Sequence, residues 1–183
     1  MLGRIEAHWV YGGTLAALIL LLLVPTLGWP LPEILIFLAL PAYMIHQFEE
    51  HDDGRFKSFI NDMVGDAHRG LDDTAIFVVN FFGVWVLLAL VILAARLIDT
   101  GWGAVAAYLM LINGIVHVMP AILLKRYNPG LVTGVALFGP LGTLILITTG
   151  PDSFQHLTGF GGILALHILI LLYARSPKTK PIP

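Results

Sequence analysis

The sequence has no cysteine and very little charge. Without cysteine the 183-residue chain can form no disulfide and offers no thiolate, so a bound metal would need histidine, carboxylate or amide ligands. Charged residues make up 12% of the chain and hydrophobic residues 57%, whereas soluble domains carry about 25% charged residues. A formal net charge of −2 without a basic stripe argues against nucleic acid as a partner. The composition indicates a protein surrounded by the lipid bilayer.

Hydrophobic runs alternate with polar breaks along the whole chain. A helix needs ~20 apolar residues to cross the hydrocarbon layer, and such runs predict spans near 9–27, 31–49, 75–97, 102–124, 131–149 and 156–174. We therefore expect an all-α, polytopic membrane helix bundle of about six transmembrane helices, forming a single domain over residues 1–183. Gly139-Pro140 interrupts the fifth run, so a count of five spans stays open.

Basic residues sort to one side of these spans. Lysine and arginine prefer the cytoplasmic loops of membrane proteins. With six spans, Arg96 falls alone on one side and nine of the ten basic residues fall on the other: Arg4, Arg55, Lys57, Arg69, Lys125, Arg126, Arg175, Lys178 and Lys180. We expect both termini in the cytoplasm and a multi-pass protein of the bacterial cytoplasmic membrane. The apolar stretch after Arg4 is interpreted as a span because no small-residue cleavage site follows it.

The longest connection, residues 50–74, mixes charged residues with apolar ones at helical spacing. This pattern predicts a cytoplasmic, amphipathic helix that lies in the membrane interface or folds back over the site, with a solvated loop as the alternative. The apolar positions are Phe56, Phe59, Ile60, Met63 and Val64. Asp72, Asp73 and Thr74 then offer an N-cap for the third span.

The most informative polar residues end the second span. In a helix, His46, Glu49 and Glu50 share one face because they stand at i, i+3 and i+4. Acidic residues at the cytoplasmic, C-terminal end of a helix oppose both the helix dipole and the preference for basic residues there. A simple polar cap does not explain that sign of charge, so we take these three residues as the centre of a candidate site.

Other polar residues lie at a similar depth. Asn113 and His117 stand four apart on the fourth span, and Asn80 lies near the cytoplasmic end of the third. At ~1.5 Å per residue, these depths agree within roughly 5 to 10 Å. His117 is either a member of the site or a packing residue, whereas the apolar neighbours of His167 favour packing for that histidine.

The segment after the fourth span reads Tyr127-Asn128-Pro129-Gly130. Proline followed by glycine at the central positions predicts a type II turn, and therefore a tight hairpin between the fourth and fifth spans. Tyr127 would anchor at the membrane interface or hang over the mouth of the site.

With His46-Gln47-Phe48-Glu49-Glu50, a later membrane histidine at His117, and Tyr127-Asn128-Pro129-Gly130, the chain resembles the HXXEE family of bacterial and related membrane proteins. That family is recognised by an HxxEE segment, another histidine and a YxPG segment. The resemblance implies that the matching positions matter, but it implies no activity. These positions are His46, Glu49, Glu50, His117, Tyr127, Pro129 and Gly130.

The chemistry of these residues favours a membrane enzyme acting on a lipid-like or apolar small molecule that enters from the bilayer. His46, Glu49, Glu50 and His117 would be catalytic, either as ligands of one divalent ion (Zn, Fe or Mn) or, without metal, as general acid and base. HxxEE is not the HExxH zinc helix, which counts against a metal, and the sequence has no second copy of the segment, so a single-metal or metal-free site is more natural than a two-metal one. The supporting residues would be Asn80, Asn113, Tyr127, Pro129 and Gly130.

Two functions from other classes use the same residues. In a proton-coupled transporter the acids and histidines would carry protons, although the apolar opposite half of the spans argues against a complete path. In a non-catalytic assembly or lipid-binding protein, His46, Glu49 and Glu50 would bond to one another or to Arg55 and Lys57. The sequence leaves the oligomeric state open.

Overall fold

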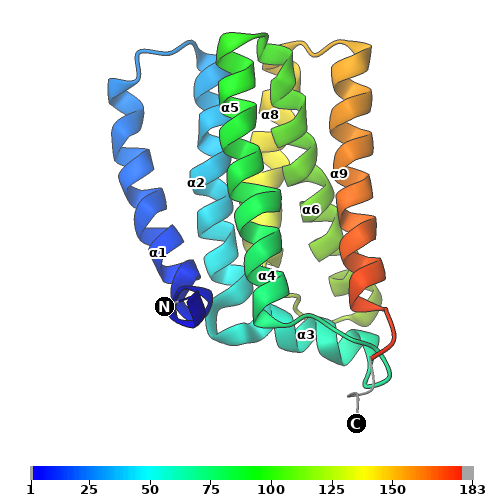
Figure 1. Ribbon diagram of the computed structural model, residues 1–183. Helices are drawn as coiled ribbons and strands as arrows, with labels where there is room; N and C mark the ends of the chain where they lie inside the picture. Colours follow the sequence, from blue (N-terminus) through cyan, green and yellow to red (C-terminus); the bar gives the residue numbers. More distant parts are fainter. Residues whose placement is uncertain (1, 179–183) are drawn as a thin grey trace.

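The computed structural model describes residues 2–178, and helices account for most of them. Within this range there is no β-strand, only an isolated bridge between His68 and Pro177. Six helical rods run side by side along the bundle, and each is long and apolar enough to cross a membrane (Figure 1). The prediction of an all-α bundle with six spans is therefore confirmed, and the count of five is wrong.

Several rods are composite. The first is α1 (Leu2–Leu23) with η1 (Val24–Thr26), the second α2 (Leu31–His51), and the third α4 (Asp73–Asn80), the π-helical η3 (Phe81–Val86) and α5 (Leu87–Leu97). The fourth is η4 (Thr100–Trp102) with α6 (Gly103–Leu124), the fifth α7 (Leu131–Thr133), the π-helical η5 (Gly134–Phe138) and α8 (Gly139–Thr149), and the sixth α9 (Ser153–Ala174). These bounds follow the predicted spans closely, except that the first helix already begins at Leu2.

Helix α3 (Arg55–Val64) lies across the end of the bundle and not along it (Figure 1). The chain turns out of α2 through η2 (Asp52–Gly54), where Asp53 and Gly54 have φ angles of 57° and 67°. The side chain of Asn61 then exchanges two hydrogen bonds with the backbone of Leu71 and so ties α3 to the segment before α4. This part of the connection is helical, and its placement in a membrane interface stays a prediction.

The start of α1 and the end of α9 lie at the same end of the bundle as α3 (Figure 1). An even number of crossings requires this arrangement. Arg96 stands near the far end, in the last turn of α5. The other basic residues expected on the cytoplasmic side belong to the end that carries α3, except Lys180, which lies outside the described residues. That this end faces the cytoplasm stays a prediction.

At the far end, polar side chains pair across the helices. Arg96 forms an ion pair with Glu33 of α2, and its guanidinium lies 4.0 Å from the ring centroid of Trp29. The side chain of Gln155 on α9 donates to Asp99 at 2.8 Å. Between this end and the end that carries α3, the core consists of buried apolar side chains such as Ile36, Leu88, Leu109, Met110 and Ile145.

Two glycines let the fourth and fifth rods approach closely. A Cβ on Gly114 of α6 would lie only 3.2 Å from the carbonyl oxygen of Gly134 in η5. Helix packing at small residues of this kind is common in membrane proteins. The close approach brings the beginning of the fifth rod beside His117, which is one turn from Gly114 on α6.

The absence of cysteine makes the orientation directly testable. We expect Ile98→Cys, at the far end, to react with a membrane-impermeant maleimide in intact bacterial cells, because that end would face outward. Lys178→Cys should react only after the membrane is permeabilised. The opposite pattern would reverse the orientation, and labelling of both in intact cells would contradict six crossings.

Candidate functional site

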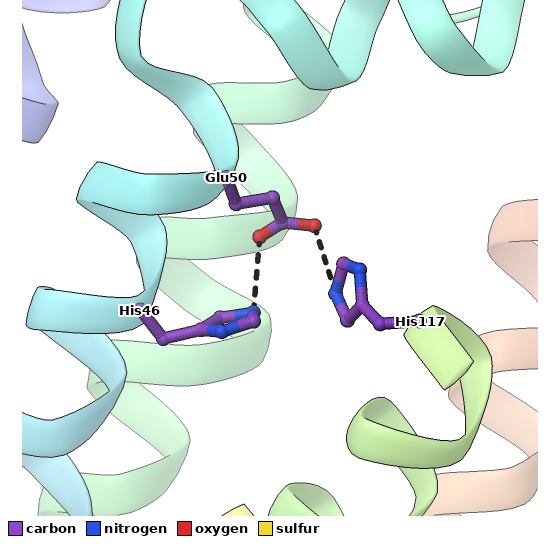
Figure 2. A group of neighbouring side chains, drawn as sticks. All are labelled: His46, Glu50 and His117. Carbon is purple, nitrogen blue, oxygen red and sulfur yellow. Dashed lines mark ion pairs between the residues drawn. The ribbon is translucent and has the colours of Figure 1, made fainter. Parts of the chain in front are cut away.

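Three side chains from two helices meet inside the bundle near the end covered by α3 (Figure 2). His46 and Glu50 stand one turn apart on α2, and His117 comes from α6. Their exposed fractions are 0%, 5% and 1%. One ligand atom from each residue lies within 4.8 Å of the others. The structure therefore brings together three of the four residues expected at the centre of the site.

The carboxylate of Glu50 lies between the two imidazoles. Its Oε2 atom is 3.5 Å from Nε2 of His46, and its Oε1 atom is 3.4 Å from Nε2 of His117. Both distances exceed the 2.7–3.2 Å range of N–H···O hydrogen bonds. Both Nε2 atoms, and Nδ1 of His117, are buried without a hydrogen-bond partner. Because an unpaired buried polar group costs about 1–3 kcal/mol, this group is incomplete as a hydrogen-bond cluster.

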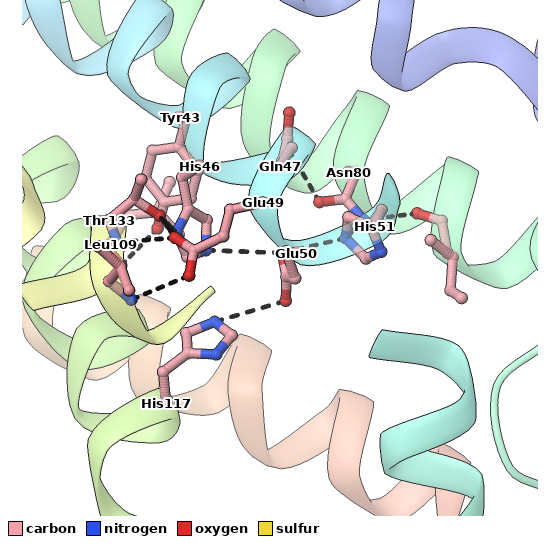
Figure 3. A network of polar contacts seen from close by, with 12 residues as sticks. Tyr43, His46, Gln47, Glu49, Glu50, His51, Asn80, Leu109, His117 and Thr133 are labelled. Carbon is pink, nitrogen blue, oxygen red and sulfur yellow. Dashed lines mark hydrogen bonds and ion pairs between the residues drawn. The ribbon is translucent and has the colours of Figure 1, made fainter. Parts of the chain in front are cut away.

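Glu49 is directed to a different partner, the beginning of the fifth rod (Figure 3). Its carboxylate accepts hydrogen bonds from the hydroxyl of Tyr127 at 2.5 Å and from the backbone N–H of Val132 at 3.0 Å. Thr133 donates twice more, from its backbone N–H at 2.7 Å and from its hydroxyl at 2.5 Å. The N-cap residue of α7 is Gly130, which has no side chain, so Glu49 caps this helix from α2. The structure does not bring Glu49 into the group around Glu50.

The turn from Tyr127 to Gly130 closes over the two histidines. The backbone N–H of Leu131 donates to the carbonyl oxygen of Asn128 at 3.0 Å, and Gly130 has φ 93° and ψ −5°, which confirms the predicted type II turn. A Cβ on Gly130 would lie 2.7 Å from Cε1 of His117 and 2.8 Å from Cε1 of His46. The backbone of Gly130 therefore packs directly against both imidazoles.

Both residues before the proline of this turn bond to the site. The sequence left two roles open for Tyr127, an anchor at the membrane interface or a place over the mouth of the site. In the structure its hydroxyl donates to Glu49. Partial burial and this hydrogen bond raise the pKa of Tyr127 to about 12, so the phenol remains a donor at neutral pH. The amide of Asn128 donates to the backbone carbonyl of His117 at 3.1 Å, while its Oδ1 atom is buried and unpaired. Pro129 occupies the second position of the type II turn, which runs from Asn128 to Leu131.

His51 is a neighbour of the site that sequence reasoning missed. Its Nε2 atom lies 3.0 Å from Oε2 of Glu50, within hydrogen-bond range, so His51 holds one side of that carboxylate. The residue directly follows the HxxEE segment at the last position of α2. Its closeness to the acidic pair was the available signal, but a histidine at the end of a span also fits a solvated cap.

Gln47 is the second neighbour that was missed. The indole N–H of Trp85, which can only donate, bonds to Oε1 of Gln47 at 2.6 Å and so determines the orientation of the amide. Nε2 of Gln47 then donates to Oδ1 of Asn80 at 2.8 Å, and the amide of Asn80 donates to the carbonyl of Ile76. Asn80, expected as a supporting residue, therefore lies in the polar network beside His51 (Figure 3).

A cavity of about 280 Å³ adjoins Glu50 and His117. Its walls are mainly apolar side chains of α3, α4, α6 and α9. Asn113, expected as a supporting residue, lines it one turn before His117, and its Oδ1 atom is buried without a partner. His167, which the sequence assigned to packing, also lines the cavity, and its Nδ1 atom donates to the carbonyl of Ile163 at 2.9 Å.

Gly130→Ala should destabilise the protein for two separable reasons. Gly150 also has a positive φ, 59°, but a Cβ there meets nothing within 4 Å. Both substitutions incur the left-handed backbone penalty of roughly 1–2 kcal/mol. Only Gly130→Ala also displaces the imidazoles, so its thermal unfolding midpoint in detergent should fall further than that of Gly150→Ala. Equal midpoints would contradict the close contact with the histidines.

Comparison with known proteins agrees with the family resemblance that the HxxEE segment, His117 and the segment from Tyr127 to Gly130 indicate. No curated protein and no solved structure gives a significant match. The model of a family described as a protein of unknown function with HXXEE motif matches residues 37–145, more than half of the chain. The matched range contains both site histidines, the acidic pair and the whole turn from Tyr127 to Gly130. The chain therefore belongs to the HXXEE family.

Proposed function

We propose that this protein is a membrane-embedded enzyme that holds one divalent metal ion with His46, Glu50 and His117 and acts on a lipid-like or apolar small molecule. One observation carries the proposal. Two buried Nε2 atoms without hydrogen-bond partners flank the same carboxylate, at distances too long for hydrogen bonds.

The spacing of the three residues fits a metal. Zinc lies about 2.0–2.2 Å from nitrogen and oxygen ligands, which places neighbouring ligand atoms of a tetrahedral site about 3.3–3.6 Å apart. The two N···O distances are 3.5 Å to one oxygen of Glu50 and 3.4 Å to the other, and one ligand atom from each of the three residues lies within 4.8 Å of the others. Imidazole and carboxylate suit zinc, iron and manganese, and three protein ligands leave a position for water or substrate. Such an ion polarises a substrate oxygen or makes a bound water more acidic.

The remaining polar residues would orient this set. His51 donates to Oε2 of Glu50 at 3.0 Å and so restricts rotation of the carboxylate. Contacts to the second oxygen or nitrogen of a metal ligand are a regular feature of protein metal sites. The turn at Gly130 covers both imidazoles and excludes water from that side. The site is therefore closed on the side of the fifth rod and open on the side of the cavity.

The cavity supports an apolar substrate. An engineered cavity of about 150 Å³ holds one benzene molecule, and this one measures about 280 Å³. Val116, Ile168 and Leu171 line it from α6 and α9 and are 39%, 48% and 42% exposed on the lateral surface. In a bilayer that surface meets hydrocarbon, so a longer molecule would place its reacting end near His117 and its tail among the lipids.

The core makes transport a weaker alternative. Proton-coupled transport would need polar groups between the site and the far end of the bundle. The buried side chains in that region include Ile36, Leu88 and Met110, and the one hydroxyl of Tyr43 is already bonded to the carbonyl of Leu109 at 2.7 Å. Among the described residues, a mainly apolar core therefore separates the site at this end from the polar pairs at the far end.

Metal analysis tests the proposal directly. Protein purified without chelators should contain about one divalent ion per chain, measured by inductively coupled plasma mass spectrometry. Glu50→Gln and His117→Ala should each lose it, because each removes a ligand, while the exposed control His8→Ala should retain it.

Elution as a single monodisperse species would show that the Glu50→Gln variant is still folded. Wild-type protein without stoichiometric metal would overturn the metal site, and would leave a proton-exchanging or structural pair of Glu50 and His117. Retention of the ion by both site variants would overturn the assignment of the ligands.

Two neighbouring positions on α4 test the cavity. Val79 lines it, whereas Val78 does not and is 44% exposed. Val79→Phe should reduce the amount of apolar molecule that copurifies in mild detergent, because the ring fills the space, and Val78→Phe should not. The measurement is organic extraction followed by mass spectrometry. An equal amount with both variants would show that the cavity is not the binding site.

A further inference from the structure

Glu49, Thr133 and His46 form a line of hydrogen bonds that leads to the proposed metal site (Figure 3). Oγ1 of Thr133 lies 2.5 Å from Oε2 of Glu49 and 2.7 Å from Nδ1 of His46. The two glutamates of the HxxEE segment therefore both act on His46, but from different sides. Oε2 of Glu50 lies 3.5 Å from Nε2 of the same ring.

The contacts of Glu49 exclude it as a ligand. A carboxylate offers about four lone-pair positions. Two backbone N–H groups and two hydroxyls occupy them: the donors belong to Tyr127, Val132 and Thr133. A backbone N–H can only donate, and the carboxylate lies at the positive end of a helix, so both conditions favour its ionised, accepting form.

The direction of the hydrogen bonds then determines where the proton of His46 lies. The hydroxyl of Thr133 has one hydrogen, and Glu49 accepts it. Oγ1 of Thr133 must therefore accept from His46, so Nδ1 carries the imidazole proton. The Nε2 atom of His46 is left with a lone pair, directed into the space beside Glu50 where it has no hydrogen-bond partner.

We propose that Glu49 is a positioning residue, which acts through Thr133 to hold His46 in the Nδ1-protonated tautomer with Nε2 free to bind the metal. Metal-binding histidines usually donate their other N–H to an oxygen, and this contact sets both the tautomer and the orientation of the ring. Here the oxygen is a hydroxyl oriented by a carboxylate. The tautomer is independent of the metal, whereas its use in ligation rests on the proposed function.

Nuclear magnetic resonance of the metal-free protein with ¹⁵N-labelled histidine tests the tautomer. The His46 signals are identified by their loss in His46→Gln. Wild type should show a protonated Nδ1 and an unprotonated Nε2 at His46. Thr133→Val has nearly the same shape and keeps the backbone N–H that donates to Glu49. Because it removes the hydroxyl that accepts from Nδ1, it should shift the population towards the Nε2–H form, which can donate to Glu50. Thr133→Ser, which keeps the hydroxyl, should behave as wild type.

A cobalt titration of the same variants tests the consequence for ligation. Loss of an outer contact of this kind typically weakens metal binding 10–100-fold. We expect that loss in Thr133→Val and Glu49→Gln, with near wild-type affinity in Thr133→Ser and no measurable site in Glu50→Gln. The ligand-field absorption of bound cobalt reports the coordination directly.

The two measurements separate this inference from the proposed function. Wild type that binds no cobalt would remove the metal site, and the tautomer spectrum would still decide how Glu49 acts on His46. An Nε2–H tautomer in wild type, or an unchanged tautomer in Thr133→Val, would overturn the role of Glu49. Unchanged cobalt affinity in Thr133→Val, with binding lost in Glu50→Gln, would overturn its contribution to ligation.

Discussion

The carboxylate of Glu49, bonded to the first turn of the fifth rod, holds the site together. A helix begins with backbone N–H groups that have no partner within the helix, and with the positive end of its dipole. Glu49 supplies the missing acceptor for Val132 and Thr133 from the last turn of α2. The unfavourable position of this acid at the negative end of its own helix is offset by the positive end of another. This joins the second and fifth rods at the depth of the histidines.

The three segments that define the family form one structural unit through this contact. The turn that begins at Tyr127 bonds to Glu49, its Asn128 bonds to the backbone of His117, and Gly130 packs against both imidazoles. Removal of any one of these segments would leave another without its partner. A reason for the glycine is also visible: the turn requires a positive φ, and the imidazole rings leave no space for a side chain.

Hydrophobicity and turn chemistry were sufficient to predict the spans and the hairpin, because both depend on neighbouring residues in the chain. The depth argument also agrees with the contact of His117 with Glu50 and with the place of Asn113 in the wall of the adjoining cavity. The different surroundings of Glu49 and Glu50 could not be predicted, since i+3 and i+4 positions both lie on the face of His46 and only the packing of α6 and α7 separates them. Gln47 was missed because its partner Trp85 comes from another helix, and His51 was missed because a histidine beside Glu50 at the end of a span also fits a solvated cap.

The adjacency of the two acids follows from the chemistry of a single imidazole. His46 has two nitrogens on opposite sides of its ring, and a metal ligand needs a lone pair on one and a hydrogen-bond acceptor near the other. Consecutive helical residues point about 100° apart, so one glutamate can face α6 while the next faces α7. Glu50 approaches Nε2 directly, and Glu49 reaches Nδ1 through Thr133. In the proposed site the HxxEE segment therefore supplies one carboxylate for each nitrogen of its own histidine, and neither acid can replace the other.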